Sequence, residues 1–333
     1  MANTCDEPFL SYRVAGVGLH LSGAVGDSLA HFARWFAASF YALPDSAAPA
    51  EITLQLTTRV PSAPPATPRV HPSPGVHIRR QGTHCWLFLP EAVCALDLQA
   101  RHGTLWLGPG FWHRSRKRQQ EPVLLALVWL LRECRRYSLH ASAVARGEHG
   151  LVLAGESGSG KSTAALGLVH QGWRYLADDV VLLEPATDGL RLWGLVRGFA
   201  YHPALLTRLP ELANPTSAAA ELNGEKRFIE LDAVYPDRHL PGGRCGALIF
   251  PHVVAQARSQ LLPLEPVASL SALLQASAGL LTDKNHAATQ LEFLKNLVMQ
   301  HPAYRLLAGR DIFGNGLALE ALLTAGGVLE QLP

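Results

Sequence analysis

The feature that most constrains this chain is a glycine-rich segment that fits the pattern G-x-x-x-x-G-K-[ST] without a mismatch. Glycines in such a segment let backbone N–H groups turn inward around phosphate oxygens, because no Cβ atom stands in the way. Lys161 supplies a mobile positive charge for the β- and γ-phosphates, and the hydroxyl of Ser162 is placed to ligate Mg²⁺. The sequence therefore predicts a binding site for ATP and Mg²⁺. Its residues are Gly155, Glu156, Ser157, Gly158, Ser159, Gly160, Lys161, Ser162 and Thr163.

The segments around this motif match the local structure that a phosphate-binding loop requires. An apolar run over Leu151–Ala154 predicts a buried strand before the loop, and the residues from Lys161 to about Gln171 predict a helix after it. Two further apolar runs, Tyr175–Ala177 and Val180–Leu183, predict strands. Strand, glycine loop, helix and strand together predict an α/β nucleotide-binding unit. The alternative is a glycine-rich turn that binds no ligand.

Two adjacent acids, Asp178 and Asp179, follow the strand predicted after the helix. Proteins with a phosphate-binding loop place an acid at such a position to hold Mg²⁺, so both are candidate metal ligands together with Ser162. Adjacent residues of a strand point to opposite faces, so one carboxylate can face the nucleotide while the other faces a backbone group or a histidine. The alternative is a turn in which an Asp side chain bonds to its own backbone.

Further candidates lie on both sides of the motif. His140, in the run His-Ala-Ser-Ala-Val, is a candidate catalytic residue, although a histidine among small apolar residues is more often structural. Arg197, and Lys226 with Arg227 in a Gly-Glu-Lys-Arg-Phe segment, can complete the phosphate site, as basic residues do in other phosphoryl-transfer enzymes. Lys226 gains weight because the chain has only five lysines. A solvated turn is the competing interpretation for these basic residues.

The N-terminal part of the chain has a different pattern, which predicts a smaller α+β domain over 1–118. Apolar residues at helical spacing predict a helix over Ser28–Leu43. The stretch 61–74 predicts a loop or linker, because proline is too dense there for a helix or a central strand. We expect a second domain over 119–333, beginning with a helix over Gln119–Tyr137. Alternating runs predict strands over Ile52–Leu56, Val76–Arg79, Cys85–Leu89, Val93–Leu98 and Thr104–Leu107, the last four as an antiparallel meander.

Composition excludes several classes of protein. The formal net charge of +2 is too balanced for a nucleic-acid-binding surface, so we expect no nucleic-acid partner. No run of about 18 uncharged apolar residues occurs, which predicts no membrane span. The five cysteines include no CxxC pair, so neither a zinc site nor a disulfide framework is indicated, and a reducing cytosol is compatible with them. The N-terminus lacks the basic segment that begins a signal peptide, so we expect a cytoplasmic protein.

The segment over 137–185 resembles the catalytic domain of the HPr kinase/phosphorylase family. It has a His-bearing strand at His140 and then LVLAGESGSGKSTAALGLVHQGWRYLADDVVLL, in the order and with the spacing of that family. Phosphoenolpyruvate carboxykinase has a related fold with similar blocks. The resemblance implies a P-loop kinase domain of the HPr kinase/PEP carboxykinase type, which phosphorylates a protein serine with ATP and Mg²⁺. It also implies that Asp178 is the base toward the substrate hydroxyl, that Asp179 and His140 orient it or assist at the metal, and that the chain forms a homo-oligomer.

Two departures from that family concern the metal site with the phosphorylase activity, and the substrate. The bacterial kinase has a Glu-Ile-Arg-Gly stretch with an acidic metal contact, whereas this chain has Leu195-Val196-Arg197-Gly198, which keeps the Arg-Gly and lacks the acid. Residues 1–118 do not look like the N-terminal domain of that family. The chain fits better with HPr-kinase-like proteins found beside peptide-modification genes, including lasso-peptide kinases. We therefore expect a peptide or protein substrate with an acceptor hydroxyl, a serine by the same resemblance, recognised by the N-terminal domain.

Two other functions fit the same motifs. One is a small-molecule phosphotransferase or carboxykinase-like enzyme, which would transfer phosphate to a metabolite. The other is a nucleotide-binding regulatory module with little chemistry. Asp178, Asp179 and His140 favour catalysis over binding alone, and the large N-terminal unit favours a macromolecular acceptor. A transporter ATPase and a GTPase are disfavoured, because no Ser-Gly-Gly-Gln or Asn-Lys-x-Asp segment follows the loop.

Overall fold

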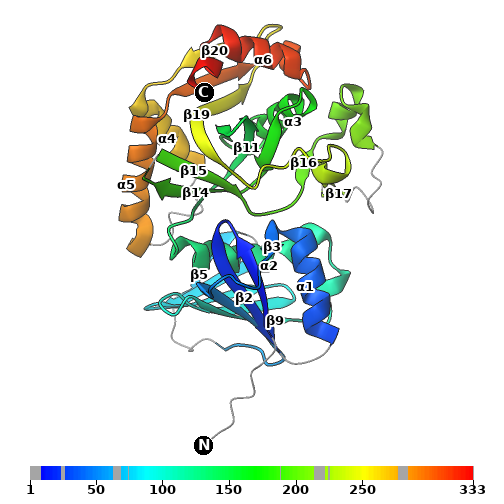
Figure 1. Cartoon of the computed structure of the whole chain (residues 1–333), viewed down its shortest axis with the longest axis vertical. Helices are drawn as coiled ribbons and strands as arrows, with labels where there is room; N and C mark the ends of the chain where they lie inside the picture. Colours follow the sequence, from blue (N-terminus) through cyan, green and yellow to red (C-terminus); the bar gives the residue numbers. More distant parts are fainter. Residues whose placement is uncertain are drawn as a thin grey trace, which may run out of the picture. The chain divides into compact units, whose positions relative to one another are not determined.

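The structure of the chain is a computed structural model, which describes residues 9–23, 27–62, 69–73, 75–187, 189–213, 222–223, 226–276 and 284–332. The chain divides into two compact units, Met1–Arg136 (unit 1) and Tyr137–Pro333 (unit 2). Figure 1 colours unit 1 from blue through cyan and unit 2 from green to red. Both units combine β-sheets with helices, so the chain is a mixed α/β protein.

Unit 1 is built on a mixed sheet whose strands follow the order β3-β1-β2-β4-β9-β8-β7-β6-β5. β4 runs parallel to its neighbours β2 and β9, and the other neighbouring strands are antiparallel. The predicted antiparallel meander is confirmed as β6 to β9. The strands are β1 (Phe9–Val14), β2 (Val17–Gly23), β3 (Ala42–Pro44), β4 (Ile52–Thr57), β5 (Arg69–Ser73), β6 (Val76–Gln81), β7 (His84–Leu89), β8 (Ala92–Asp97) and β9 (His102–Leu107).

The helices of unit 1, α1 (Asp27–Ser39) and α2 (Arg116–Arg132), pack against this sheet and against each other. Along β7 buried side chains alternate with more exposed ones, as expected for a sheet with one face covered. Hydrogen bonds join the two helices: Trp35 Nε1 donates to Gln119 Oε1 at 2.9 Å, and Gln120 Nε2 donates to the carbonyl of Ser39 at 3.2 Å. The helical layer of unit 1 is therefore held by polar contacts as well as by its apolar core.

The boundary between the units lies after Arg136, whereas the sequence places it between residues 118 and 119. The difference is α2, which the sequence assigns to the second domain. The buried face of α2, which includes Val123, Leu127 and Leu130, packs against β7, β8 and β9 of unit 1. An amphipathic helix belongs with the sheet that its apolar face covers, and the order of the chain does not reveal which sheet that is.

Unit 1 also contains strands that the sequence analysis does not predict. β5 lies within the stretch 61–74 expected to be a loop or linker, of which 63–68 and 74 are outside the described residues. β5 pairs with β6 at the edge of the sheet, where a residue without an N–H such as Pro72 is tolerated. β1 and β2 form a hairpin whose turn residues, Ala15 and Gly16, have φ values of 50° and 78°. A type I′ turn needs these two positive values, and its twist matches that of the strands.

The main sheet of unit 2 has the order β10-β14-β15-β19-β12-β11-β13, with β21 beside β19 and β20 beside β21. β19 runs parallel to β12 and to β21. β11 lies between β12 and β13 and is antiparallel to both, so β12 and β13 point in the same direction. The strands are β10 (Tyr137–Leu139), β11 (Ala141–Arg146), β12 (His149–Ala154), β13 (Arg174–Ala177), β14 (Val181–Ala186), β15 (Gly189–Gly194), β19 (Gly242–Val253), β20 (Gln260–Pro263) and β21 (Ala303–Ala308).

Helices cover both faces of this sheet. Ala143 of β11 and Val152 of β12 belong to a core that also contains Leu273 of α4 and Leu294 of α5. Residues of β11 that alternate with Ala143 face α3, which packs against β11 and α6. Figure 1 shows α4 and α5 on the opposite side of the sheet from α3. The helices are α3 (Lys161–His170), α4 (Pro266–Ala276), α5 (Lys284–Gln300) and α6 (Gly316–Ala325).

A smaller sheet of unit 2 has the order β16-β18-β17 and contacts α3 through β16. Its position depends on Gly198, which has a φ of 108°. A Cβ on Gly198 would lie 2.2 Å from the ring of Phe228, so only glycine lets β18 approach this closely. The strands are β16 (Phe199–Tyr201), β17 (Leu222–Asn223) and β18 (Lys226–Ile229). Short 3-10 helices are η1 (Phe111–His113), η2 (Pro203–Thr207), η3 (Pro210–Ala213), η4 (Leu231–Ala233), η5 (Arg310–Ile312) and η6 (Leu329–Gln331).

The elements predicted around the glycine loop are confirmed as β12, α3, β13 and β14. The two helices of unit 1 end before their predicted ends, α1 because a strand follows and α2 because the chain turns at Arg135, which has a φ of 60°. α1 ends at Ser39 and β3 follows it, and α2 ends at Arg132 and β10 begins at Tyr137. Within the described part of the chain, no helix is both long and apolar enough to cross a membrane.

Candidate functional site

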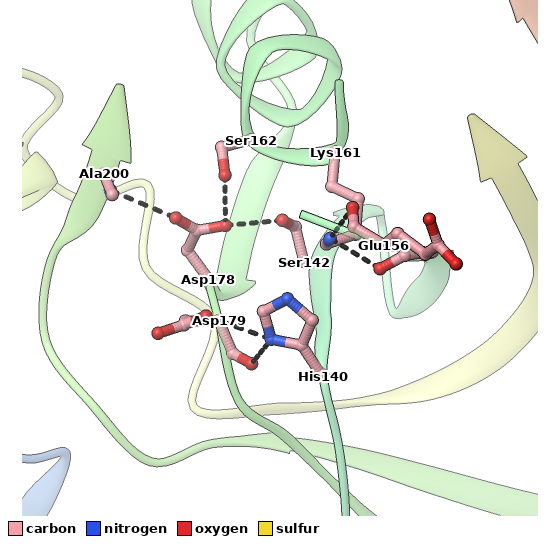
Figure 2. Close-up of polar contacts among 9 residues, drawn as sticks. His140, Ser142, Glu156, Lys161, Ser162, Asp178, Asp179 and Ala200 are labelled. Atoms are coloured by element: carbon pink, nitrogen blue, oxygen red, sulfur yellow. Dashed lines mark hydrogen bonds and ion pairs between the residues drawn. The ribbon is translucent and has the colours of Figure 1, made fainter. Parts of the chain in front are cut away.

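Three segments of unit 2 meet at one edge of its main sheet. The glycine loop follows the carboxyl end of β12, and Asp178 follows the carboxyl end of β13. Because these strands point in the same direction, the loops that follow them lie at the same edge, which is where α/β proteins bind their ligands. β11 runs the opposite way, so its first residues and the preceding His140 also lie at this edge. Figure 2 shows these segments together.

The glycine loop has backbone conformations that glycine adopts most easily. Gly158 and Gly160 have φ values of 84° and 100°, in the left-handed region. Gly160 is the N-cap of α3, so the first N–H groups of that helix and the positive end of its dipole are directed at the loop. A phosphate is the ligand that a loop and helix end of this kind favour.

Lys161 is held inside this loop. Its side chain is buried, with 6% of the residue exposed, and Nζ donates to the carbonyls of Gly155 at 2.7 Å and Glu156 at 2.9 Å. Burial is the largest of the effects that lower the pKa of Lys161, and the positive charge of Lys226 lowers it further, while the charges of Asp178 and Asp179 raise it. A buried ammonium group whose charge is disfavoured would gain from an anion placed beside it.

Of the other predicted basic residues, Lys226 acts on Lys161 and Arg197 has a different partner. Lys226 begins β18, so the small sheet brings its charge to the loop. Its neighbour Arg227 follows it in the strand, which directs the two side chains to opposite faces. The guanidinium of Arg197 forms an ion pair with Asp232 Oδ2 at 3.0 Å. The charge of Lys226 thus acts on that of Lys161, whereas Arg197 is held at Asp232.

The carboxylate of Asp178 is buried against the helix that follows the loop. Only 4% of the residue is exposed. Asp178 Oδ1 accepts hydrogen bonds from Ser142 Oγ at 2.5 Å and Ser162 Oγ at 2.8 Å, and Oδ2 accepts from the N–H of Ala200 at 3.1 Å (Figure 2). Burial is the main cause of a raised pKa at Asp178, and these hydrogen bonds oppose it. The Ser162 hydroxyl and the Asp178 carboxylate therefore face each other directly.

Ser142 is the residue of this cluster that the sequence analysis missed. It lies on β11 and is fully buried in a run of alanine and valine. A buried hydroxyl in an apolar strand needs a hydrogen-bond partner, and here the partner is Asp178. The available signal was its spacing from His140, because residues two apart in a strand share a face. The identity of the partner could not be read from the sequence.

Asp179 and His140 form a second, more exposed pair beside Asp178. His140 Nδ1 lies 3.0 Å from Asp179 Oδ1 and 3.0 Å from the backbone carbonyl of Asp179. About half of the Asp179 side chain and 39% of the His140 side chain are exposed. Asp179 has a φ of 71°, so a left-handed turn, and not strand alternation, separates its carboxylate from that of Asp178. Asp178 is thus buried at the glycine loop, and Asp179 is exposed to solvent beside His140.

The residues at the loop suit a nucleotide with Mg²⁺. Ser159 Oγ is buried without a hydrogen-bond partner among the described residues, and the positive charge of Lys226 acts on that of the buried Lys161. Both features favour an anionic ligand with several acceptor oxygens. In the described ranges no group of three or more His, Cys, Asp and Glu side chains could hold a metal ion. The Ser162 hydroxyl and the Asp178 carboxylate are a donor pair compatible with Mg²⁺, which takes one or two carboxylates and completes its shell with phosphates and water.

Comparison with known proteins gives no family for this chain. No protein-family model matches it, and no curated protein matches it. Among solved structures it is similar to the Hpr(Ser) kinase/phosphatase from Coxiella burnetii, with 16% sequence identity and a TM-score of 0.31. The match covers 58% of this chain and 98% of that one. What this chain can do is therefore read from its own site.

Proposed function

We propose that unit 2 is an ATP- and Mg²⁺-dependent kinase domain that transfers the γ-phosphoryl group to a hydroxyl of a peptide or protein substrate, a serine by the sequence resemblance. The observation that supports this most directly is the hydrogen bond between Ser162 Oγ and Asp178 Oδ1. It joins the hydroxyl that follows the phosphate-binding lysine to a buried carboxylate from the next strand. In P-loop enzymes a serine or threonine and an aspartate in these positions hold Mg²⁺.

Each part of the loop has a distinct task in this proposal. The N–H groups of the loop and of the first turn of α3 bind phosphate oxygens, and Lys161 and Lys226 neutralise their charge. Ser162 and Asp178 hold Mg²⁺, which supplies further stabilisation of negative charge on the phosphates when it is bound. The buried hydroxyl of Ser142 fixes the orientation of the Asp178 carboxylate.

Burial supports a division of labour between the two acids that differs from the one implied by the resemblance, which makes Asp178 the base. Both oxygens of Asp178 already accept hydrogen bonds inside the protein. Asp179 is open to solvent, where an acceptor hydroxyl can approach, and His140 orients its carboxylate. In the transfer step the acceptor oxygen bonds to the γ-phosphorus, the bond from that phosphorus to the bridging oxygen of ADP breaks, and the hydroxyl proton passes to Asp179.

The macromolecular substrate is the part of this proposal that rests on unit 1. Unit 1 is a separate compact unit of sheet and helices, and a kinase that acts on a small metabolite does not require such a unit. A unit of this kind can bind a peptide or protein. We assign it substrate recognition on this ground. The homo-oligomer implied by the resemblance is part of the same proposal, and sedimentation of the purified chain measures it.

Phosphoryl transfer to peptides tests the proposal. The purified chain is incubated with Mg²⁺, γ-labelled ATP and a random peptide library that contains one serine per peptide, and a matched library has alanine in its place. We expect label in the serine library alone, a mass gain of one phosphoryl group, and loss of both with Lys161→Met. Consumption of ATP without labelled peptide would favour a small-molecule phosphotransferase. Binding of ATP without any turnover would favour a regulatory module.

A further inference from the structure

A cavity of about 440 Å³ lies in unit 2 beside the glycine loop. Its walls are the loop residues Gly155–Ser159, the end of β19 at Phe250–Val253, Ala272 and Gln275 of α4, and Arg305 of β21. Pockets that bind small organic ligands have volumes of about 300–1,000 Å³. The cavity is therefore large enough for a ligand of the size of a nucleoside.

The cavity begins at the glycine loop and lies away from Lys161 and from the acceptor side. Neither Lys161 nor the aspartates Asp178 and Asp179 line it. Figure 2 shows the Glu156 side chain extending away from Asp178, and Glu156 is a lining residue. In a nucleotide the nucleoside is attached to the end of the phosphate chain, so it extends out of a loop that binds the phosphates. This cavity is the space next to the first residues of the loop. An acceptor must instead approach the His140–Asp179 pair, which lies outside the cavity.

The lining chemistry suits a base and a ribose. Phe250, Pro251 and Ala272 give apolar surface, which favours the faces of a planar ring. Arg305 and Gln275 are exposed polar residues at the same cavity, and they can donate to acceptor atoms on the edge of a base. Within the part of the chain that the structure describes, the guanidinium of Arg305 has no ion-pair partner. A guanidinium group in this state can also stack on an aromatic ring.

We infer that this cavity holds the nucleoside of the nucleotide whose phosphates occupy the loop, with Arg305 as its main polar contact. This inference rests on the proposed function, because it needs polyphosphate binding at the loop. It adds the residues that distinguish a nucleotide from a bare polyphosphate. The distinction is measurable, since inorganic tripolyphosphate offers the same phosphate chain without a nucleoside.

Calorimetric titration of the full chain with ATP and with tripolyphosphate, each with Mg²⁺, tests the inference. We expect the unmodified chain to bind ATP more tightly than tripolyphosphate. Arg305→Ala should weaken ATP binding about tenfold and leave tripolyphosphate binding unchanged. Ala272→Phe, which fills the cavity, should have the same selective effect. The matched controls are Arg191→Ala, at an exposed arginine outside the cavity, and Val267→Phe, at a position of α4 that is 82% exposed.

The outcomes separate this inference from the proposed function. Equal weakening of ATP and tripolyphosphate by Arg305→Ala would make Arg305 a phosphate contact and overturn the inference. Unchanged ATP binding in both cavity variants would overturn it as well, while the proposed function stood. Failure of the unmodified chain to bind either ligand would overturn the proposed function itself. Unfolding temperatures of all variants show that the affinities belong to folded protein.

Discussion

The two units bury different kinds of polar side chain. In unit 1 the buried polar residues among those described are Ser39 and Gln120, both neutral, and the largely buried charge of Arg132 is paired with Glu133. Ser39 and Gln120 lie where α1 and α2 meet, and Gln120 donates to the carbonyl of Ser39. In unit 2 the buried polar residues include two charged ones, Lys161 and Asp178. Both charges lie at the glycine loop.

We interpret this difference as that between a structural joint and the proposed nucleotide site. A neutral amide that satisfies a carbonyl at a helix end costs little to bury. A charged group is costly to bury, and it is retained where a ligand or a reaction needs it. Burial lowers the pKa of Lys161 and raises the pKa of Asp178, and both shifts reflect the free energy that it costs to bury these charges. Substitutions of the buried polar residues should therefore act differently in the two units. At the glycine loop they should reduce activity more than stability, and at the joint between α1 and α2 they should reduce stability and leave activity unchanged.

Removal of the Lys161 charge should give the largest loss of activity with little loss of stability. Lys161→Met keeps the apolar stem and removes the ammonium group, so the rate of phosphoryl transfer should fall by about 10³-fold. Because burial disfavours the charge, the unfolding free energy should not fall with it. Single-turnover transfer and chemical denaturation measure the two effects. The control is Lys295→Met, at a half-exposed lysine of α5. An equal loss of rate in this control would contradict the assignment of Lys161 to the phosphates.

The two aspartates should separate metal binding from proton transfer. Asp178→Asn should weaken Mg²⁺-dependent ATP binding and reduce transfer by about 10²-fold, because it removes the buried carboxylate beside Ser162. Asp179→Asn should reduce transfer by about 10²-fold and leave ATP affinity unchanged. Titration calorimetry together with transfer rates distinguishes the two. The reverse pattern would make Asp178 the base.

The same Asp178 variant should change how stability depends on pH. The carboxyl of an unfolded chain titrates near about 3.9, and burial raises the pKa of Asp178 in the folded protein. Between these two values the folded state holds a proton that the unfolded state has lost, so stability falls as the pH rises through this window. Asp178→Asn removes the titrating group and should therefore abolish this decline. A denaturation series from pH 3 to 8, at about one-unit steps, measures it.

The sequence predicted what depends on contiguous residues and missed what depends on distant ones. The glycine loop, α3 and the Asp pair lie within one segment, so local pattern was sufficient. The hydrogen bond from Ser142 to Asp178 joins β11 to the residue that follows β13. These two strands are neighbours because of the order of the strands in the sheet, which local sequence does not reveal. The approach of β18 to Gly198 is equally non-local. The same reason explains α2, whose apolar pattern predicts a helix without identifying the sheet that it covers.

Ser142 should be a positioning residue with a moderate effect. Ser142→Ala removes a hydrogen bond that lowers the pKa of Asp178, so the pKa of that carboxyl should rise further. We expect transfer to fall about tenfold and its acidic limb to move to higher pH, with partial rescue by Ser142→Thr. The pH profile of the transfer rate measures this. A tenfold loss with an unmoved profile would mean that the serine contributes only packing.

Gln120 completes the comparison from unit 1, with the smallest effect. Gln120→Leu removes the donor to the Ser39 carbonyl from a buried site, which should lower the unfolding free energy by about 1–2 kcal/mol. Transfer at saturating substrate should be unchanged, since this amide belongs to the joint between α1 and α2. Hydrogen exchange locates the effect: protection should fall in α1 and α2 and stay constant in α3. Gln99→Leu, at an exposed glutamine of the same unit, should leave exchange unaltered. Loss of transfer in Gln120→Leu with α3 protection intact would place a neutral buried amide among the functional residues, and the distinction between the two units would fail.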